Sequence, residues 1–186
     1  HTNKPEEIFN MKFDVIISNP PYQLNDGGGT GSSAIPLYHY FVEKSIQLNP
    51  RYLTMIIPSR WFTGGKGLDD FRSKMLNDER IREIHDFINA GDCFPGVAIE
   101  GGVCYFLWDR DNKGLCKVVS YANNEIVAVS ERPLLEEGTD VFIRYNEVIS
   151  IIRKVKSHKE KSFSQIVSTR NPYGINSADF KKMKSQ

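Results

Sequence analysis

One short sequence, Asn19-Pro20-Pro21-Tyr22, follows an apolar run at residues 13–18. The Asn19 side-chain oxygen and a neighbouring backbone carbonyl are two hydrogen-bond acceptors, and two acceptors match an exocyclic NH2 group with its two donors. Pro20 has no N–H, so it contributes only its carbonyl. Tyr22 offers a flat face on which a ring that carries the amine can stack. These residues suit binding a planar amine while an electrophile approaches it, and no metal ion is expected.

The segments around this motif predict an α/β fold. The β-branched run at residues 13–18 predicts a strand buried on both faces, as in a parallel sheet covered by helices. Pro20 and Pro21 end that strand and place Asn19 at its carboxyl end, where open α/β sheets bind ligands. Helices are predicted at residues 35–48, 68–77 and 146–156, and strands at residues 52–57, 81–88, 101–108, 117–121 and 125–129.

Two of these segments bear on the site. The helix at residues 35–48 has Pro36 in its first turn, and the residues at helical spacing are Leu37, Tyr40, Phe41, Lys44, Ser45 and Leu48. The sequence Pro58-Ser59-Arg60-Trp61-Phe62 ends the next strand, at the same edge as Asn19. Its aromatic pair either lines a pocket or packs in the core, and core packing is the more common role.

Composition narrows the class of protein. The chain has 186 residues and a formal net charge of +1, so charge alone gives no support for nucleic-acid binding. Its three cysteines are odd in number and lack C-x-x-C spacing, which argues against a disulfide framework and a zinc site. No apolar run approaches membrane-spanning length, and the polar start has no signal-peptide core. A cytoplasmic protein without a membrane partner is predicted.

Other motifs are weaker. The glycine-rich segment at residues 23–33 fails the dinucleotide pattern and predicts a mobile loop beside the site. Lys66 follows two glycines, but Arg60 stands where a phosphate loop needs glycine. His85, alone in a strand, is expected to be structural. A basic cluster either faces a phosphate backbone or is a solvated helix end; it comprises Arg153, Lys154, Lys156, Lys159 and Lys161.

Asn19-Pro20-Pro21-Tyr22 after a hydrophobic strand resembles the catalytic motif of S-adenosylmethionine-dependent amino-methyltransferases, above all the N6-adenine DNA methyltransferases. The motif alone is shared by protein-glutamine and some RNA guanine-N2 methyltransferases. The order of elements, with Phe94-Pro95 in a loop between two later strands, is more specific. Over residues 11–110 it resembles the catalytic half of Eco57I-like restriction–modification methyltransferases.

The resemblance implies a partial Rossmann-like methyltransferase fold, with a mostly parallel sheet and an antiparallel hairpin. In such enzymes a glycine-containing cofactor loop precedes the motif strand, and no glycine occurs among the first twelve residues here. The chain is therefore expected to lack the N-terminal cofactor-binding half and to be inactive alone. Residues 1–160 would complete the catalytic domain, and residues 161–186 would begin a truncated target-recognition domain.

The resemblance also assigns roles to residues. The methyl group of S-adenosylmethionine would pass to a flipped-out adenine whose N6 hydrogens bind Asn19 and the Pro20 carbonyl, with Pro21 stiffening the loop. Tyr22 and Phe94 would stack on opposite faces of the base, and Asn19 is the one residue expected also at the cofactor. Expected partners are double-stranded DNA and a fused or associated endonuclease. Alternatives are methylation of RNA guanine or protein glutamine, or a non-catalytic specificity fragment.

Overall fold

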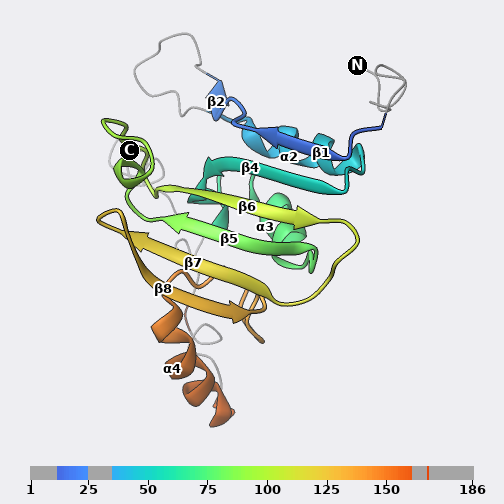
Figure 1. Cartoon of the computed structure of the whole chain (residues 1–186). Helices are drawn as coiled ribbons and strands as arrows, with labels where there is room; N and C mark the ends of the chain where they lie inside the picture. The colour runs from blue at the N-terminus through green and yellow to red at the C-terminus, as the bar shows by residue number, and fades with distance from the viewer. Residues whose placement is uncertain (1–11, 25–34, 161–166, 168–186) are drawn as a thin grey trace, which may run out of the picture. The chain divides into compact units, whose positions relative to one another are not determined.

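The computed structural model describes residues 12–24, 35–160 and 167 (Figure 1). The chain divides into two compact units, residues 1–149 and 150–186. The division falls inside helix α4 (Asn146–Ser157). The domain boundary expected between residues 160 and 161 lies at the limit of the described residues and stays a prediction. No helix in the described ranges combines the length and apolar character that crossing a membrane requires.

Six strands of the first unit form one sheet (Figure 1). Their order across it is β1 (Val15–Ser18), β4 (Tyr52–Pro58), β6 (Val103–Asp109), β5 (Ile81–Phe87), β7 (Cys116–Ala122) and β8 (Glu125–Arg132). The pairs β1–β4 and β5–β7 are parallel, whereas β4–β6, β5–β6 and β7–β8 are antiparallel. β1, β4, β5 and β7 therefore point the same way, and β6 and β8 run against them. The predicted α/β class and mostly parallel sheet are confirmed.

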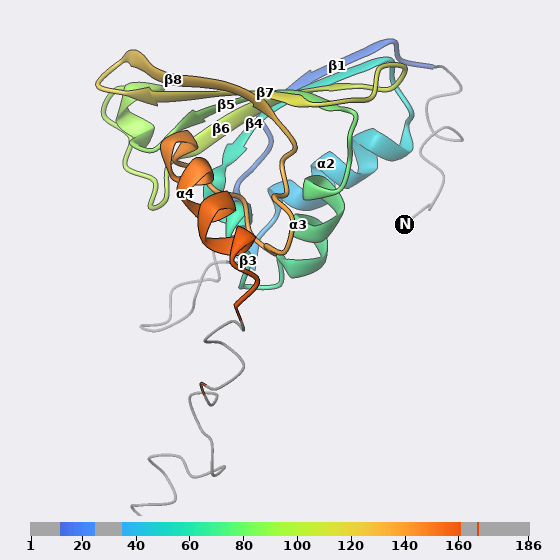
Figure 2. The ribbon, with the colours of Figure 1, turned by 90° about the horizontal axis from the view of Figure 1, so that it is seen from below.

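Two helices, α2 (Tyr38–Gln47) and α3 (Asp69–Leu76), lie on the same face of the sheet (Figure 2). Successive strand residues point to opposite faces, and every second residue of β4 is buried in the core beneath the helices: Leu53, Met55 and Ile57. The helices add Tyr38, Val42, Phe71 and Met75 to this core. Burial of these side chains fixes the end of β4 and the start of α2, the two elements that hold the site.

β1 is less buried than the sequence indicated. Val15 and Ile17 are 51% and 77% exposed, and Ile16 packs against the core. The prediction of a strand buried on both faces is wrong for the described residues. β1 lies at one edge of this sheet, and α2 and α3 both lie on the same face of the sheet (Figure 2), the face whose core Ile16 contacts.

The first helix begins at Tyr38, later than predicted, because the residues before it form a strand. β3 (Ile35–Pro36) pairs antiparallel with β2 (Gln23–Leu24), and the Leu37 N–H donates to the Tyr22 carbonyl at 3.0 Å. The buried face of α2 also differs from the predicted one, since Tyr40 and Phe41 are exposed. The side chains that it buries are Tyr38, His39, Val42 and Ser45.

After β8 the chain returns under the sheet as a strap, residues 133–145. Phe142 donates its N–H to the Phe62 carbonyl at 3.1 Å, and the two rings lie 4.3 Å apart. Phe62 belongs to the 3-10 turn η1 (Ser59–Phe62) that follows β4, where Trp61 and Phe62 are fully buried. The prediction that this aromatic pair packs in the core is confirmed.

Candidate active site

A cavity of about 750 Å³ lies at the carboxyl ends of β1 and β4. All four residues of Asn19-Pro20-Pro21-Tyr22 line it. The rest of its wall comes from β2 and β3, from the start of α2, from the end of β4 and the segment after it, and from the loop before β6. Sequence reasoning did not assign the lining residues Tyr38, Arg60, Lys66, Ile99 and Glu100 to a site. We refer to this space as the motif cavity.

The backbone on both sides holds the motif in place. β1 pairs in parallel with β4 up to Ser18, which lies opposite Met55, so the motif starts where the ladder ends. Pro20 is buried and Asn19 is exposed. The hydrogen bond from Leu37 to the Tyr22 carbonyl closes the far side. The Asn19 amide makes no hydrogen bond within the described part of the chain, so both its oxygen and its NH2 are available to a ligand.

Tyr22 contributes an aromatic face and a neutral hydroxyl. Its ring is partly buried against the main core, and its Oη has no hydrogen-bond partner among the residues that the structure describes. Burial, with smaller effects from Cys93 and Cys104, raises the pKa of Tyr22 to about 12. The phenol therefore stays protonated at physiological pH, and no general-base role follows from it.

Phe94 lies near the motif cavity but does not line it. It follows the turn η2 (Ala90–Asp92), and its N–H donates to the Ala90 carbonyl at 2.8 Å. Its ring packs in a small cluster that includes Ile99, and Ile99 lines the cavity. Cys93, in the same loop, contributes to the raised pKa of Tyr22, which indicates that this loop lies next to the motif. Stacking of Phe94 on a base stays a prediction.

Among the lining residues that sequence reasoning missed, Arg60 and Lys66 had signals in the sequence that could have identified them. Arg60 comes two residues after Pro58, the last residue of β4, and that position alone predicted the same sheet edge as Asn19. Lys66 was considered only as part of a phosphate loop. Ile99 and Glu100 carried no local signal, because the chain returns to the cavity only through the loop between β5 and β6.

His85 is engaged in contacts within the sheet. Its Nδ1 lies 3.0 Å from the Tyr121 hydroxyl and its Nε2 lies 3.2 Å from a Glu83 oxygen. Its ring stacks on Tyr105 at 4.3 Å, and it does not line the motif cavity. This agrees with the structural role expected for it.

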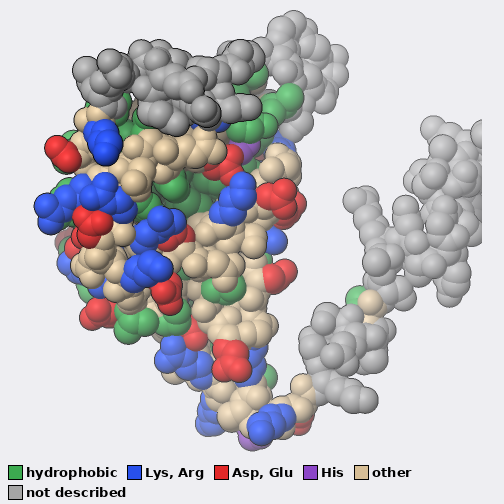
Figure 3. Space-filling view, turned by 90° about the vertical axis from the view of Figure 1, so that its right-hand side faces the viewer, with side chains coloured by type: hydrophobic (Ala, Val, Ile, Leu, Met, Phe, Trp, Pro, Cys, Tyr) green, Lys and Arg blue, Asp and Glu red, His purple; other side chains and the backbone are tan. Residues whose placement is uncertain are grey.

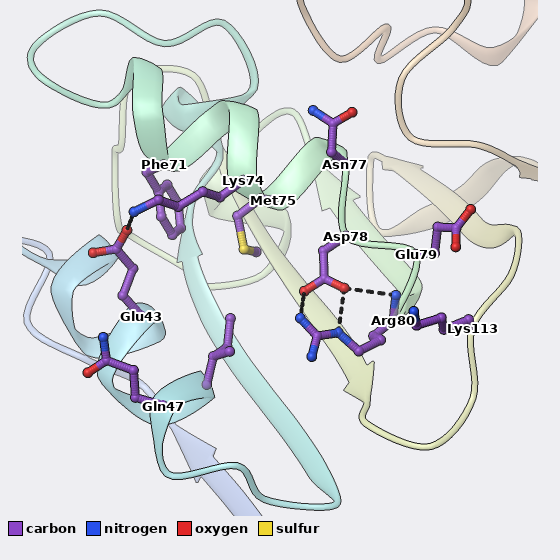
Figure 4. A pocket seen from close by; sticks show the side chains of 11 residues that line it. Glu43, Gln47, Phe71, Lys74, Met75, Asn77, Asp78, Glu79, Arg80 and Lys113 are labelled. Atoms are coloured by element: carbon purple, nitrogen blue, oxygen red, sulfur yellow. Dashed lines mark hydrogen bonds and ion pairs between the residues drawn. The ribbon is translucent and has the colours of Figure 1, made fainter. Parts of the chain in front are cut away.

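A second cavity, of about 660 Å³, lies between the ends of α2 and α3 and the residues before β5 (Figure 4). Its charged groups are largely paired. Lys74 contacts Glu43 at 2.7 Å, and Arg80 contacts Asp78 through two side-chain hydrogen bonds. Seen from the edge where β1, β4 and β5 begin, side chains of both charges are interspersed (Figure 3). None of the buried unpartnered side-chain atoms found in the described residues belongs to this cavity's lining, so it is the weaker candidate.

The expectations for the glycine-rich loop and for the basic cluster stay predictions. The expected mobile loop at residues 23–33 falls mostly on residues 25–34, outside the described residues. The basic cluster lies mainly on α4 in the second unit, with Lys161 outside the described ranges. Both interpretations of that cluster stay open.

A model of the Eco57I restriction-modification methylase family matches residues 1–94 of the chain. The chain belongs to this family. The expected resemblance to Eco57I-like restriction–modification methyltransferases is thereby confirmed. A family of methylases implies a methyl donor.

A curated relative of this Eco57I-family chain is much longer than the chain itself. An "Uncharacterized adenine-specific methylase" from Mycoplasma pneumoniae is 45% identical over 106 residues, which are 56% of this chain and 25% of that protein. The chain thus spans about a quarter of the length of the curated relative that it matches.

Two solved structures from type I restriction–modification systems are also similar. One comes from a study of complex assembly and conformational transition and has a TM-score of 0.46 at 15% identity. The match covers 83% of this chain and 32% of the other chain. The other is a methyltransferase subunit from Streptococcus thermophilus, with a TM-score of 0.44 at 12% identity, and it covers 81% of this chain and 33% of its own.

Proposed function

We propose that this chain is part of a DNA adenine N6-methyltransferase of a restriction–modification system, with S-adenosylmethionine as the methyl donor. The observation that carries the proposal is the motif cavity, because Asn19, Pro20, Pro21 and Tyr22 form one wall of it at the carboxyl edge of the sheet. The family and the adenine-specific methylase relative support the same class of reaction.

The proposed work of the motif is to orient an amine. Asn19 Oδ1 and the Pro20 carbonyl accept the two hydrogens of adenine N6, and the nitrogen lone pair is left free to attack. Two acceptors on a rigid support achieve this by position more than by acid–base chemistry. The exposed Asn19 amide, unused by the described chain, suits that role. The neutral Tyr22 ring lies beside it and offers the stacking face.

An adenine inside a duplex is out of reach, so the base must leave the helix at a cost of a few kcal/mol. Stacking offsets part of that cost, at roughly 1–3 kcal/mol for each base face covered. We assign one face to Tyr22 and the other to Phe94. A shift of Phe94 past Ile99 toward the cavity is needed for the second contact, since Ile99 rather than Phe94 lines the cavity here.

The cofactor fits this chain in part. When bound, S-adenosylmethionine supplies an electrophilic methyl group. We assign Asn19 to cofactor binding, because its exposed amide on the cavity wall can contact both the methyl donor and the target amine from one position. Double-stranded DNA is the proposed substrate, and an endonuclease, fused or associated, is the proposed partner.

The experiment is methyl transfer by the full-length protein with radiolabelled S-adenosylmethionine, offered duplex DNA, RNA and a release-factor protein as substrates. We expect label in N6-methyladenine of duplex DNA. Asn19→Ala should abolish it, and Asn112→Ala, a change at an exposed loop position away from the cavity, should leave it intact. Transfer only to RNA or protein would refute the DNA assignment, and full activity of Asn19→Ala would show that the motif is not the catalytic centre.

A further inference from the structure

The lining of the motif cavity carries more positive than negative charge. Arg60 and Lys66 both line it, and neither forms an ion pair with any described residue. Glu100 is the one acidic residue in the described lining, and it is exposed. The second cavity differs in this respect, because Lys74 and Arg80 there are already paired with carboxylates. Two unpaired cations in one cavity indicate a site for an anion.

Buried polar atoms at the same place lack partners. Arg60 Nε is buried without a hydrogen-bond acceptor within the described chain. Tyr38 is 2% exposed, and its hydroxyl oxygen lies near the Trp61 backbone N–H, but the hydroxyl proton has no acceptor among the described residues. Buried polar groups in folded proteins almost always have partners, so such a pair at one cavity wall calls for a ligand. Both groups are donors, and an anionic oxygen accepts from both.

The backbone around Lys66 has a conformation that lets a ligand approach it closely. Residues 64–67 all have positive φ, with Lys66 at +50° between Gly65 at +77° and Gly67 at +79°. A left-handed lysine is uncommon, and strain of this kind concentrates at functional sites. The loop is tied to α3, since the Gly65 N–H donates to Asp69 at 3.1 Å. Open space surrounds the Cβ positions of Gly65 and Gly67, so an extended strand can lie against them.

We infer that Arg60 and Lys66 each bind one of two neighbouring phosphodiester groups of the nucleic-acid strand that carries the target base. The inference rests on the proposed function and adds positioning residues to it. The guanidinium of Arg60 presents parallel donors that match phosphate oxygens, with the Tyr38 hydroxyl beside it. Lys66 also lines the cavity and is exposed, so it supplies a second charge for the neighbouring phosphate of the same strand. Holding these phosphates sets the distance of the base from Asn19.

The test uses the full-length protein and unmethylated genomic DNA, with Arg60→Gln, Lys66→Gln and Arg60→Lys as variants. Lys113→Gln is the matched control, since Lys113 lines the second cavity. The readout is the slope of log Kd against log salt concentration, which falls by about 0.9 for each phosphate group that the protein no longer neutralises. We expect that decrease for each Gln variant, no decrease for Arg60→Lys and none for Lys113→Gln.

Methyl transfer and S-adenosylmethionine affinity are measured on the same preparations. Unchanged slopes in both Gln variants, with methylation by the wild type, would overturn the inference and leave the proposed function standing. Reduced slopes without DNA methylation by the wild type would support the phosphate site and remove the proposed function. Weaker cofactor binding with unchanged slopes would overturn the inference in favour of a carboxylate of the cofactor. Because Lys66 is exposed, its variant tests the site even if Arg60→Gln fails to fold.

Discussion

Arg144 donates two hydrogen bonds to the buried carboxylate of Asp86, from Nε at 2.7 Å and from Nη2 at 2.6 Å. Asp86 is fully buried in β5 and also accepts from the Ser59 hydroxyl at 3.0 Å. Arg144 lies in the strap and donates a further bond to the Gly101 carbonyl at 2.7 Å. One ion pair thus joins the strap, β5, η1 and the loop before β6. Two of these four segments, η1 and the loop before β6, line the motif cavity.

Asp86→Asn should therefore destabilise the protein strongly. Breaking a buried pair leaves one charge without compensation, at a cost of about 3–5 kcal/mol. Urea unfolding at pH 7 measures it. Asp111→Asn, which alters a pair of exposed residues with Arg110, is the control and should have little effect. Equal stability of the two variants would mean that the Arg144–Asp86 pair contributes nothing to the fold.

Asp78 gives the protein a pH-dependent contribution to stability. Burial raises its pKa, but hydrogen bonds from Arg80 and from Trp108 Nε1 outweigh burial, and the net pKa of Asp78 lies below its ordinary value. A depressed folded-state pKa adds stability above the unfolded-state value of about 4, and that stability is lost as the pH falls through the folded-state pKa.

We accordingly expect Asp78→Asn to cost about 1–3 kcal/mol at pH 7, the usual cost of leaving buried donors unpaired. The difference from wild type should stay constant between pH 5 and 8 and shrink below about pH 4. Chemical denaturation across this range measures it. A difference that grew on acidification would contradict the direction of the pKa shift.

Gly102 occupies a position that no other residue fits. Its φ is +80°, and a Cβ placed there would lie 2.1 Å from the Phe87 carbonyl oxygen and 2.5 Å from that of Ile88. Gly102→Ala should cost about 3 kcal/mol or more, because backbone strain and a backbone clash add together. Gly96→Ala, at φ +81° with open space, isolates the strain and should cost only about 1 kcal/mol. Similar melting temperatures of the two variants would refute the clash.

The Tyr22 hydroxyl should be dispensable for methyl transfer and the ring should not. Its pKa of about 12 keeps it neutral, and removing a buried hydroxyl without a partner costs little. Tyr22→Phe should retain kcat/KM, whereas Tyr22→Ala should lose roughly 5- to 150-fold, the equivalent of 1–3 kcal/mol of stacking. The rate should show no ionisation of Tyr22 below about pH 11. Equal losses in both variants would assign the hydroxyl a direct role.

Local signals in the sequence predicted the motif end of the site well. Pro20 and Pro21 end the first strand and Pro58 ends the next one, so the meeting of Asn19 and Arg60 at one edge followed from topology. The start of α2 was mispredicted, because the pairing of Ile35–Pro36 with β2 is a tertiary contact that periodicity does not reveal. The strap was also invisible. Arg144 and Asp86 are 58 residues apart, and nothing beside either one indicates the other.

β1 leaves its outer row of backbone N–H and C=O groups without a partner strand in the described sheet, and Val15 and Ile17 stand exposed next to it. Bare β-branched edges of this sort recruit further strands, from the same polypeptide or from neighbouring copies. A segment that paired with this row would therefore also block fibrillar self-assembly. Preparations of this stretch in isolation are best handled at low concentration for that reason.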